Sequence, residues 1–107
     1  MDLKQFERIE IETNKLSDYL LNIQHPDGFS KAKFFLAHKF NEENLLKSLL
    51  NHLESNDSIK TIQVVFGTKY VIEAKITAPD NYTFTLRSIW MKSRINNVLK
   101  FVSAYPI

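Results

Sequence analysis

The chain contains no cysteine, only two glycines and only three prolines among its 107 residues. Without cysteine it has neither a disulfide framework nor a thiolate nucleophile. Gly28 and Gly67 stand far apart, so no glycine-rich loop can hold a nucleotide phosphate. No apolar run approaches the roughly 20 residues of a membrane-spanning helix. These absences exclude P-loop and dinucleotide-dependent enzymes, and they predict a cytoplasmic protein with no membrane partner.

Metal and cofactor chemistry also lacks a basis in the sequence. The three histidines, His25, His38 and His52, are dispersed without the paired spacing of metal ligands. Most acidic residues fall on predicted helix surfaces, and no serine sits in a nucleophile-elbow pattern. We therefore predict no metal site and no cofactor.

Hydrophobic residues make up 44% of the chain and aromatic residues 12%, which is enough for a core without covalent cross-links. The apolar pattern changes from helical spacing to alternation near residue 58. We predict a single domain, 1–107, with an N-terminal arm at 1–13, a helical part at 14–57 and an antiparallel sheet at 58–107.

Charge is divided between the two halves of the chain. Residues 1–57 carry seven basic and ten acidic residues, a net charge of −3, whereas residues 58–107 carry seven basic and two acidic residues, a net charge of +5. This division is typical of a C-terminal half that binds an anionic partner. Lysines that keep sheet edges soluble explain it equally well.

The helical part predicts three helices. The first covers about 15–22 after a cap at Asn14. The second covers about 31–39 after a cap at Ser30, with Phe29 and Phe34 spaced as a hydrophobic staple. The third follows a cap at Asn41 and ends near 55–57.

Four β-rich runs follow, at 61–66, 69–76, 82–92 and 98–104. Helices first and strands second indicate an α+β fold, with the N-terminal helices packed on one face of a four-stranded antiparallel sheet. Residues 6–12 stay open between a short strand and an irregular arm. Along 82–92, Thr85 and Arg87 share the more polar face, which is the expected solvent or ligand face.

The most informative stretch is the turn His25-Pro26-Asp27-Gly28 directly before the second helix. A helix start offers unpaired backbone N–H groups and partial positive charge, which favour a phosphate. Lys31 and Lys33 lie in that first turn, where cations oppose the helix dipole. Binding an anion and simple solvation both explain them. His25 can act as an acid or a base, or it can merely brace the turn.

Two further positions fit phosphate chemistry. Arg87 lies in mid-strand, where a charge is uncommon and a bidentate phosphate contact is favourable. A cross-strand ion pair with Glu73 explains it equally well. Tyr105, with Ser103 two residues before it, can position a phosphate or simply pack.

The motifs His25-Pro26-x-Gly28-x-Ser30-Lys31-Ala32-x-Phe34-Phe35, Gly67-Thr68-Lys69-Tyr70-Val71, Ile89-Trp90-Met91 and Ser103-Ala104-Tyr105-Pro106 carry a family resemblance over about residues 15–106. The chain resembles an uncharacterised bacterial domain family associated with toxin–antitoxin-like gene pairs and contact-dependent inhibition toxins. That family is similar to the barnase–EndoU–colicin–RelE group of small ribonucleases. Ala74 and the turn at 80–81 depart from its pattern, where glycines are expected.

The resemblance implies a metal-independent endoribonuclease that cleaves RNA, tRNA among its substrates, by attack of the ribose 2′-OH on phosphorus. It implies catalytic roles for His25, Lys31, Arg87 and Tyr105, with His25 as base or acid, and it implies that these residues share one cleft with Ser103 where the second helix meets the sheet. Substrate contacts would come from Lys33, Ser103, Thr85 and Trp90.

A second interpretation belongs to another class. The chain would then be a non-catalytic interaction module, such as an immunity or antitoxin-like protein. Either interpretation implies a cognate partner: an antitoxin or immunity protein for a toxin, or the toxin itself for an inhibitor. As a toxin module, the chain would act in the cytoplasm of a target cell.

Overall fold

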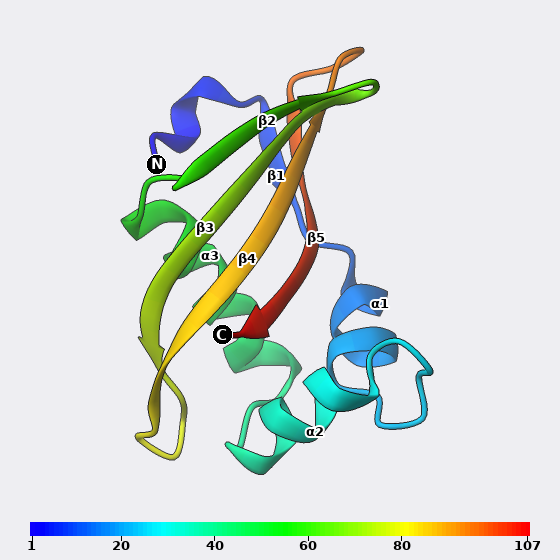
Figure 1. The fold of residues 1–107 in the computed structure, drawn as a ribbon, viewed down its shortest axis with the longest axis vertical. Helices are drawn as coiled ribbons and strands as arrows, with labels where there is room; N and C mark the ends of the chain where they lie inside the picture. The colour runs from blue at the N-terminus through cyan, green and yellow to red at the C-terminus, as the bar shows by residue number, and fades with distance from the viewer.

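The helices come first in the chain and the main strands follow, as Figure 1 shows. A computed structural model describes all residues, 1–107. Two short elements open the chain before the helices. The elements are η1 (Leu3–Gln5), β1 (Arg8–Glu10), α1 (Thr13–Lys15), η2 (Leu16–Leu20), α2 (Phe29–Ala37), α3 (Glu42–Ser55), β2 (Lys60–Val64), β3 (Gly67–Thr77), β4 (Thr83–Ser93) and β5 (Val98–Pro106).

The sheet has five strands and is mixed, in the order β1-β5-β4-β3-β2. The neighbours from β2 to β5 are antiparallel, but β1 pairs in parallel with β5, from Arg8 opposite Val98 to Glu10 opposite Lys100. The predicted four-stranded antiparallel sheet is therefore wrong. The α+β class stands, and residues 8–10 are the short strand that the sequence left open.

A three-residue strand escapes sequence analysis for a physical reason. Alternation needs at least four residues to differ from other patterns, and β1 supplies three, of which Arg8 is exposed. Its hydrogen-bonding partner lies about 90 residues away in β5. The pairing covers one edge of β5 that would otherwise present unpaired N–H and C=O groups.

Of the three helix N-caps predicted from the sequence, the structure confirms one. Asn41 caps α3 as predicted, in a reciprocal capping box with Asn44 whose two bonds measure 2.7 and 2.9 Å. The other two predicted caps are wrong. The first helix begins at Thr13 and runs directly into the π-helical turn η2, and α2 begins at Phe29, so Ser30 lies inside it.

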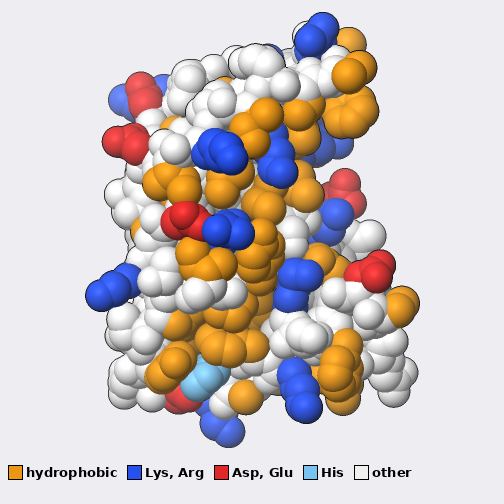
Figure 2. Space-filling view, in the orientation of Figure 1, with side chains coloured by type: hydrophobic (Ala, Val, Ile, Leu, Met, Phe, Trp, Pro, Cys, Tyr) orange, Lys and Arg blue, Asp and Glu red, His pale blue; other side chains and the backbone are white.

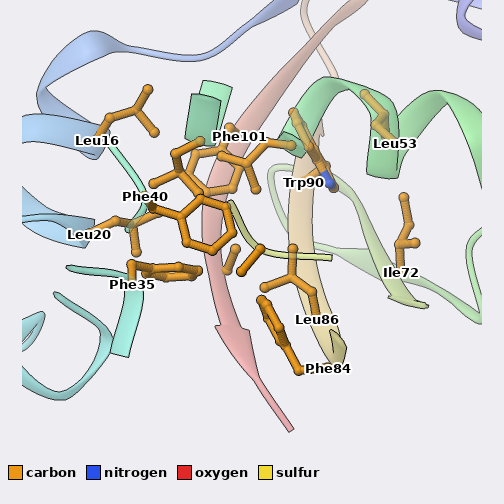
Figure 3. Packing of buried hydrophobic residues seen from close by; sticks show 14 of the residues in the cluster. Leu16, Leu20, Phe35, Phe40, Leu53, Ile72, Phe84, Leu86, Trp90 and Phe101 are labelled. Carbon is orange, nitrogen blue, oxygen red and sulfur yellow. The ribbon is translucent and has the colours of Figure 1, made fainter. Parts of the chain in front are cut away.

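The core lies between the inner face of the sheet and the helices (Figure 3). α3 crosses behind β3 and β4, and η2 with α2 closes the end near β5 (Figure 1). The largest fully buried side chains include Trp90, Phe35 and leucines from η2, α3 and β4. Trp90 meets Phe101 edge to face at 5.2 Å between ring centroids.

One polar network is sealed inside this core. His52 Nδ1 lies 2.8 Å from Ser88 Oγ, and the Trp90 indole N–H donates to the same oxygen at 2.9 Å. His52 Nε2 lies 3.3 Å from the carbonyl oxygen of Ala74. These bonds fix a neutral imidazole whose Nε2–H donates to Ala74 and whose Nδ1 accepts from Ser88. Burial lowers the pKa of His52, although the carbonyls of Ala74 and Leu86 act against the shift.

No helix covers the outer face of β2, β3 and β4, which faces the viewer in Figures 1 and 2. Figure 2 shows a band of hydrophobic side chains along the strands, with Lys and Arg side chains distributed along it. The cross-strand register orders this face. Arg87 stands between Glu73 and Tyr105 in one row, and Ile89 stands between Val71 and Ser103 in the next. None of the helices is long and apolar enough to cross a membrane.

Candidate functional site

His25 occupies the loop between η2 and α2, where its imidazole braces the start of the helix. Its Nδ1 accepts hydrogen bonds from the backbone N–H groups of Asp27 and Gly28, both at 3.0 Å. The imidazole thus accepts hydrogen bonds from backbone N–H groups at the start of the helix. This side chain takes the place of a Ser30 cap, which α2 lacks. Because the Nδ1 lone pair is engaged, the proton of the neutral ring lies on Nε2, which remains a donor.

Gly28 lets this loop dock onto η2. A Cβ at this position would lie 2.4 Å from the carbonyl oxygen of Tyr19, too close for any other residue without a backbone shift. The close approach also brings the Tyr19 ring to His25, with 5.0 Å between centroids in an edge-on arrangement. The single glycine of the motif therefore fixes the imidazole against a tyrosine.

Tyr19 links the loop to the last strand, and sequence analysis missed it. Its hydroxyl lies 3.3 Å from Ser103 Oγ, across 84 residues of sequence. Lys31 Nζ lies 5.3 Å from the ring centroid. Burial acts to raise the pKa of Tyr19, but the hydrogen bond with Ser103 and the nearby Lys31 ammonium outweigh burial and hold this pKa below its usual value.

Lys31 lies between two tyrosine rings. Its Nζ is 5.3 Å from the centroid of Tyr19 and 5.6 Å from that of Tyr105. Because Lys31 comes from α2 and Tyr105 from β5, the contact joins the helix start to the edge of the outer face. The sequence left anion binding and simple solvation as two explanations for a cation in this first turn, and the structure places Lys31 between two aromatic rings.

Arg87 completes the set on β4. Its Nε donates to Glu73 Oε2 at 2.6 Å and its Nη1 donates to the Tyr105 hydroxyl at 3.2 Å. The hydrogen bonds to Tyr105 and Glu73 raise the pKa of Arg87 above its ordinary value. The cross-strand ion pair with Glu73, one of the two sequence interpretations, is present. Arg87 also donates to Tyr105, so one guanidinium both pairs with Glu73 and contacts a tyrosine that the sequence placed in the candidate site.

We call the connected residues the tyrosine cluster: Tyr19, His25, Lys31, Arg87, Ser103 and Tyr105. The prediction that His25 and Arg87 share one cleft is wrong, because they line different hollows. His25, Tyr19 and Ser103 line one hollow, Lys31 and Tyr105 a second, and Arg87 and Tyr105 a third. The second and third hollows share Tyr105, and Lys31 reaches Tyr19 beside the first. The imidazole and the guanidinium are thus ends of one chain of contacts.

Three predicted substrate-binding residues lie elsewhere. Lys33 is exposed on α2, with its Nζ 5.4 Å from the Phe29 ring. Thr85 lies on the outer face of β4 but makes no side-chain bond to the cluster. Trp90 is completely buried and points into the core, so its ring offers no face to a nucleobase. The prediction that Trp90 stacks on substrate is wrong because alternation places it with Leu86 on the inner face.

No three His, Cys, Asp or Glu side chains gather closely enough to hold a metal ion. Two acidic groups lie beside the tyrosine cluster on different hollows: Glu73 is engaged by Arg87, and Asp18 lines the hollow of Tyr19 and His25. The donors and cations of the cluster are those that bind anionic oxygen directly.

Comparisons with known proteins place the fold and the family. No curated protein matches the chain in sequence. A solved structure described as a contact-dependent growth inhibition toxin–immunity protein complex from Klebsiella pneumoniae 342 matches with a TM-score of 0.70 at 16% identity, covering 91% of this chain and 98% of that one. At this identity the likeness shows a shared fold. The family described as "Domain of unknown function (DUF6883)" matches residues 2–107, and the chain belongs to it.

Proposed function

We propose that this member of a family of unknown function is a toxin-type, metal-independent endoribonuclease, with tRNA as the first substrate to test. The observation that carries the proposal is the tyrosine cluster. Two cations, Lys31 and Arg87, flank Tyr105, and the Tyr19 hydroxyl has a lowered pKa beside them. Proton-transfer groups with shifted pKa values, placed next to cations, are typical of phosphoryl-transfer sites.

The proposed reaction forms a bond between the ribose 2′-oxygen and phosphorus and breaks the bond from phosphorus to the 5′-oxygen. Tyr19, as phenolate, takes the 2′-OH proton, and the leaving 5′-oxygen takes a proton from water in the open site. Lys31 and Arg87 stabilise the negative charge on the phosphoryl oxygens. The products are a 2′,3′-cyclic phosphate and a free 5′-OH.

The geometry changes the role proposed for His25. A general base needs a free lone pair, and the Nδ1 lone pair of His25 is engaged by two backbone N–H groups. We therefore assign His25 as a hydrogen-bond donor, through Nε2–H, to the RNA in the hollow that it shares with Tyr19 and Ser103. Ser103 and Tyr105 orient the phosphate between the two cations, because Ser103 bonds Tyr19 and Tyr105 bonds Arg87.

The test incubates purified protein with total RNA in excess chelator and analyses the fragments. We expect discrete fragments that end in cyclic phosphate, and a cleavage rate that rises with pH as Tyr19 loses its proton. Tyr19→Phe should lower the rate by about 100-fold or more, because the proton acceptor is lost while the ring stays. Intact RNA under these conditions would contradict the proposal.

A matched pair of histidine variants separates chemistry from folding. His25→Asn keeps an oxygen that can accept the Asp27 and Gly28 N–H groups but removes the Nε2–H donor. His38→Asn changes a histidine outside the cluster, which bonds Asp80 at 2.9 Å. We expect only His25→Asn to relieve growth inhibition when the protein is expressed. Equal toxicity of all three proteins would exclude His25 from the reaction.

A second candidate function is a non-catalytic interaction module of a toxin–immunity pair. Val65, Phe66 and Ile95 favour it, because they are 82%, 69% and 91% exposed on neighbouring turns at one end of the sheet. Exposed apolar groups of this kind often mark protein contacts. As an immunity protein, the chain would be harmless on expression and would leave RNA intact, so the same assays decide between the two functions.

The proposal also includes a partner and a place of action. The similar solved structure is a complex of a toxin and an immunity protein. By analogy, we propose that a cognate immunity or antitoxin protein binds this chain and that its RNA target is cytoplasmic, whether the toxin is made there or delivered. Co-expression with the product of a neighbouring gene, followed by co-purification and growth measurement, tests for the inhibitor.

A further inference from the structure

A hollow of about 330 Å³ lies on the outer face of the sheet, next to the tyrosine cluster. Its lining is apolar where Val71 and Ile89 pair across β3 and β4, and Ile62 of β2 extends the apolar surface. Arg87 and Tyr105 line the same hollow. An apolar surface thus adjoins the position where the proposed reaction holds the phosphate.

Two lysines line this hollow as well. Lys60 stands opposite Val71, and Lys69 stands opposite Ile62, so basic and apolar side chains alternate across the two strands. Neither lysine takes part in an ion pair. The one carboxylate that lines the hollow, Glu73, is bound by Arg87. The hollow therefore keeps positive charge that no neighbouring group neutralises.

We propose that this hollow binds the base of an unpaired nucleotide next to the phosphate at Arg87, with one flanking phosphate on Lys60 and a second on Lys69. The inference rests on the proposed function, since it places the substrate around that site. A nucleobase is flat and largely apolar, so the partly exposed Ile62 and Ile89 offer it a surface to pack on, above the buried Val71. A base inside a duplex is stacked and paired and cannot enter, so the hollow selects single-stranded or loop RNA.

An acidic segment of a partner protein is the competing occupant, because Lys60 and Lys69 would attract it too. The arrangement favours the nucleotide. An acidic peptide uses the two lysines and leaves the aliphatic surface in contact with charged side chains, whereas a nucleotide satisfies both at once. The two occupants differ in whether the base contributes to binding, and a measurement can detect that.

The probe is a fluorescein-labelled single-stranded DNA hexamer, which lacks the 2′-OH and so cannot be cleaved by the proposed reaction. Its binding is measured by fluorescence anisotropy beside a duplex of the same sequence and an abasic hexamer with the same phosphates. We expect the hexamer to bind about tenfold more tightly than either of the others, because they cannot bury a base.

Variants divide the site into its two parts. Lys60→Ala/Lys69→Ala should lower the slope of log affinity against log salt by about 1.4, about 0.7 for each lost phosphate contact. Ile89→Ser should bind the abasic hexamer normally and lose most of the preference for the hexamer with bases. Lys4→Ala/Lys47→Ala, which removes two exposed lysines outside the hollow, should leave the slope unchanged. Circular dichroism melts check the fold of each variant.

The results separate this inference from the proposed function. Loss of base preference in Ile89→Ser supports the hollow even if the protein cleaves no RNA. Full cleavage of RNA by the double lysine variant and by Ile89→Ser would overturn the hollow and leave the ribonuclease intact. Two binding results would also overturn the proposal. One is an abasic hexamer that binds as tightly as the hexamer with bases; the other is hexaglutamate that displaces the labelled probe as well as the unlabelled hexamer does.

Discussion

The two faces of β4 show how the same kinds of side chain take opposite roles. On the inner face, the polar groups of Ser88, Trp90 and His52 bond one another at 2.8 and 2.9 Å and no buried side-chain polar atom lacks a partner. On the outer face, Arg87 and Tyr105 are only partly buried. The inner network has no donor left for a ligand, whereas the outer one faces solvent.

His52 in the core and His25 in the loop before α2 differ in the same way, in whether one ring N–H group is free to bind a ligand. Both nitrogens of His52 are committed, to Ser88 and to Ala74. In His25 the Nδ1 atom is committed to the backbone, and Nε2 makes no bond within the protein. A buried polar group with every bond satisfied stabilises the fold. A side chain that is held in place but keeps one donor free can contact a ligand.

The largest expected difference between the faces is in stability. Trp90→Ala should lower the free energy of unfolding by about 3–5 kcal/mol, because it opens a cavity and leaves Ser88 without a donor. Ile89→Ala, its neighbour on the outer face, should cost about 1 kcal/mol, because that side chain is partly exposed. Urea denaturation of both variants measures the difference, and equal losses would show that the outer face is packed as tightly as the inner one.

The next largest effect is on catalysis. Arg87→Gln should lower the RNA cleavage rate by about 100-fold or more, since a cation that stabilises phosphoryl oxygens is lost. Its effect on the free energy of unfolding should be small, because the ion pair with Glu73 is partly exposed and screened by solvent.

Glu73→Gln is the control for Arg87→Gln. It breaks the same ion pair while keeping the guanidinium. A cleavage rate that falls equally in both variants would show that the ion pair, and not the cation, is what matters.

The fold was predictable where local signals are strong. The change of period near residue 58 matches the boundary between α3, which ends at Ser55, and β2, which begins at Lys60. The Asn41 cap is confirmed because its partner, Asn44, lies in the same turn. The strand β1 and the start of α2 depend on distant groups, on β5 and on the Tyr19 carbonyl, and no local pattern reports them.

The candidate site divides in the same way. Cross-strand partners follow from alternation, so a pair with Glu73 was one of the two interpretations of Arg87, and the ion pair is present. Tyr19 reads in sequence as an apolar position on a helix face. Its hydroxyl matters because of Ser103, 84 residues away, and only the packing of η2 against β5 brings them together. A tyrosine in place of a leucine on that face was the one available signal.

The pH dependence of stability comes from the inner face. The pKa of folded His52 is lowered below 6.5, so the fold holds a neutral imidazole. Its contribution is fully present above pH 6.5 and is lost as the pH falls toward the folded pKa, because the unfolded chain then binds a proton that the fold does not. The loss should reach at most about 1.4 kcal/mol per pH unit. Urea denaturation between pH 7.5 and pH 5 measures it.

His52→Gln removes this ionisation and should flatten the pH dependence over that range. Two further lowered pKa values, those of Glu10 and Asp80, belong to carboxyls, whose stabilisation is lost only as the pH falls through folded values below 4.5 and 3.8. They therefore act in a more acidic window. A stability curve for His52→Gln that still falls between pH 6.5 and pH 5 would assign the effect to another histidine.

The smallest expected effects separate two lysines in one helical turn. Lys31 contacts both tyrosine rings, whereas Lys33 contacts only the exposed Phe29. Replacing either with alanine should change stability by only a few tenths of a kcal/mol, because Lys33 lies beyond the first turn of α2 and the relief of the dipole at Lys31 is offset by the loss of its two ring contacts. Cleavage should fall several-fold more in Lys31→Ala than in Lys33→Ala, because only Lys31 acts on Tyr19. A larger loss in Lys33→Ala would place the RNA on the outer side of α2 and the tyrosine cluster outside the reaction.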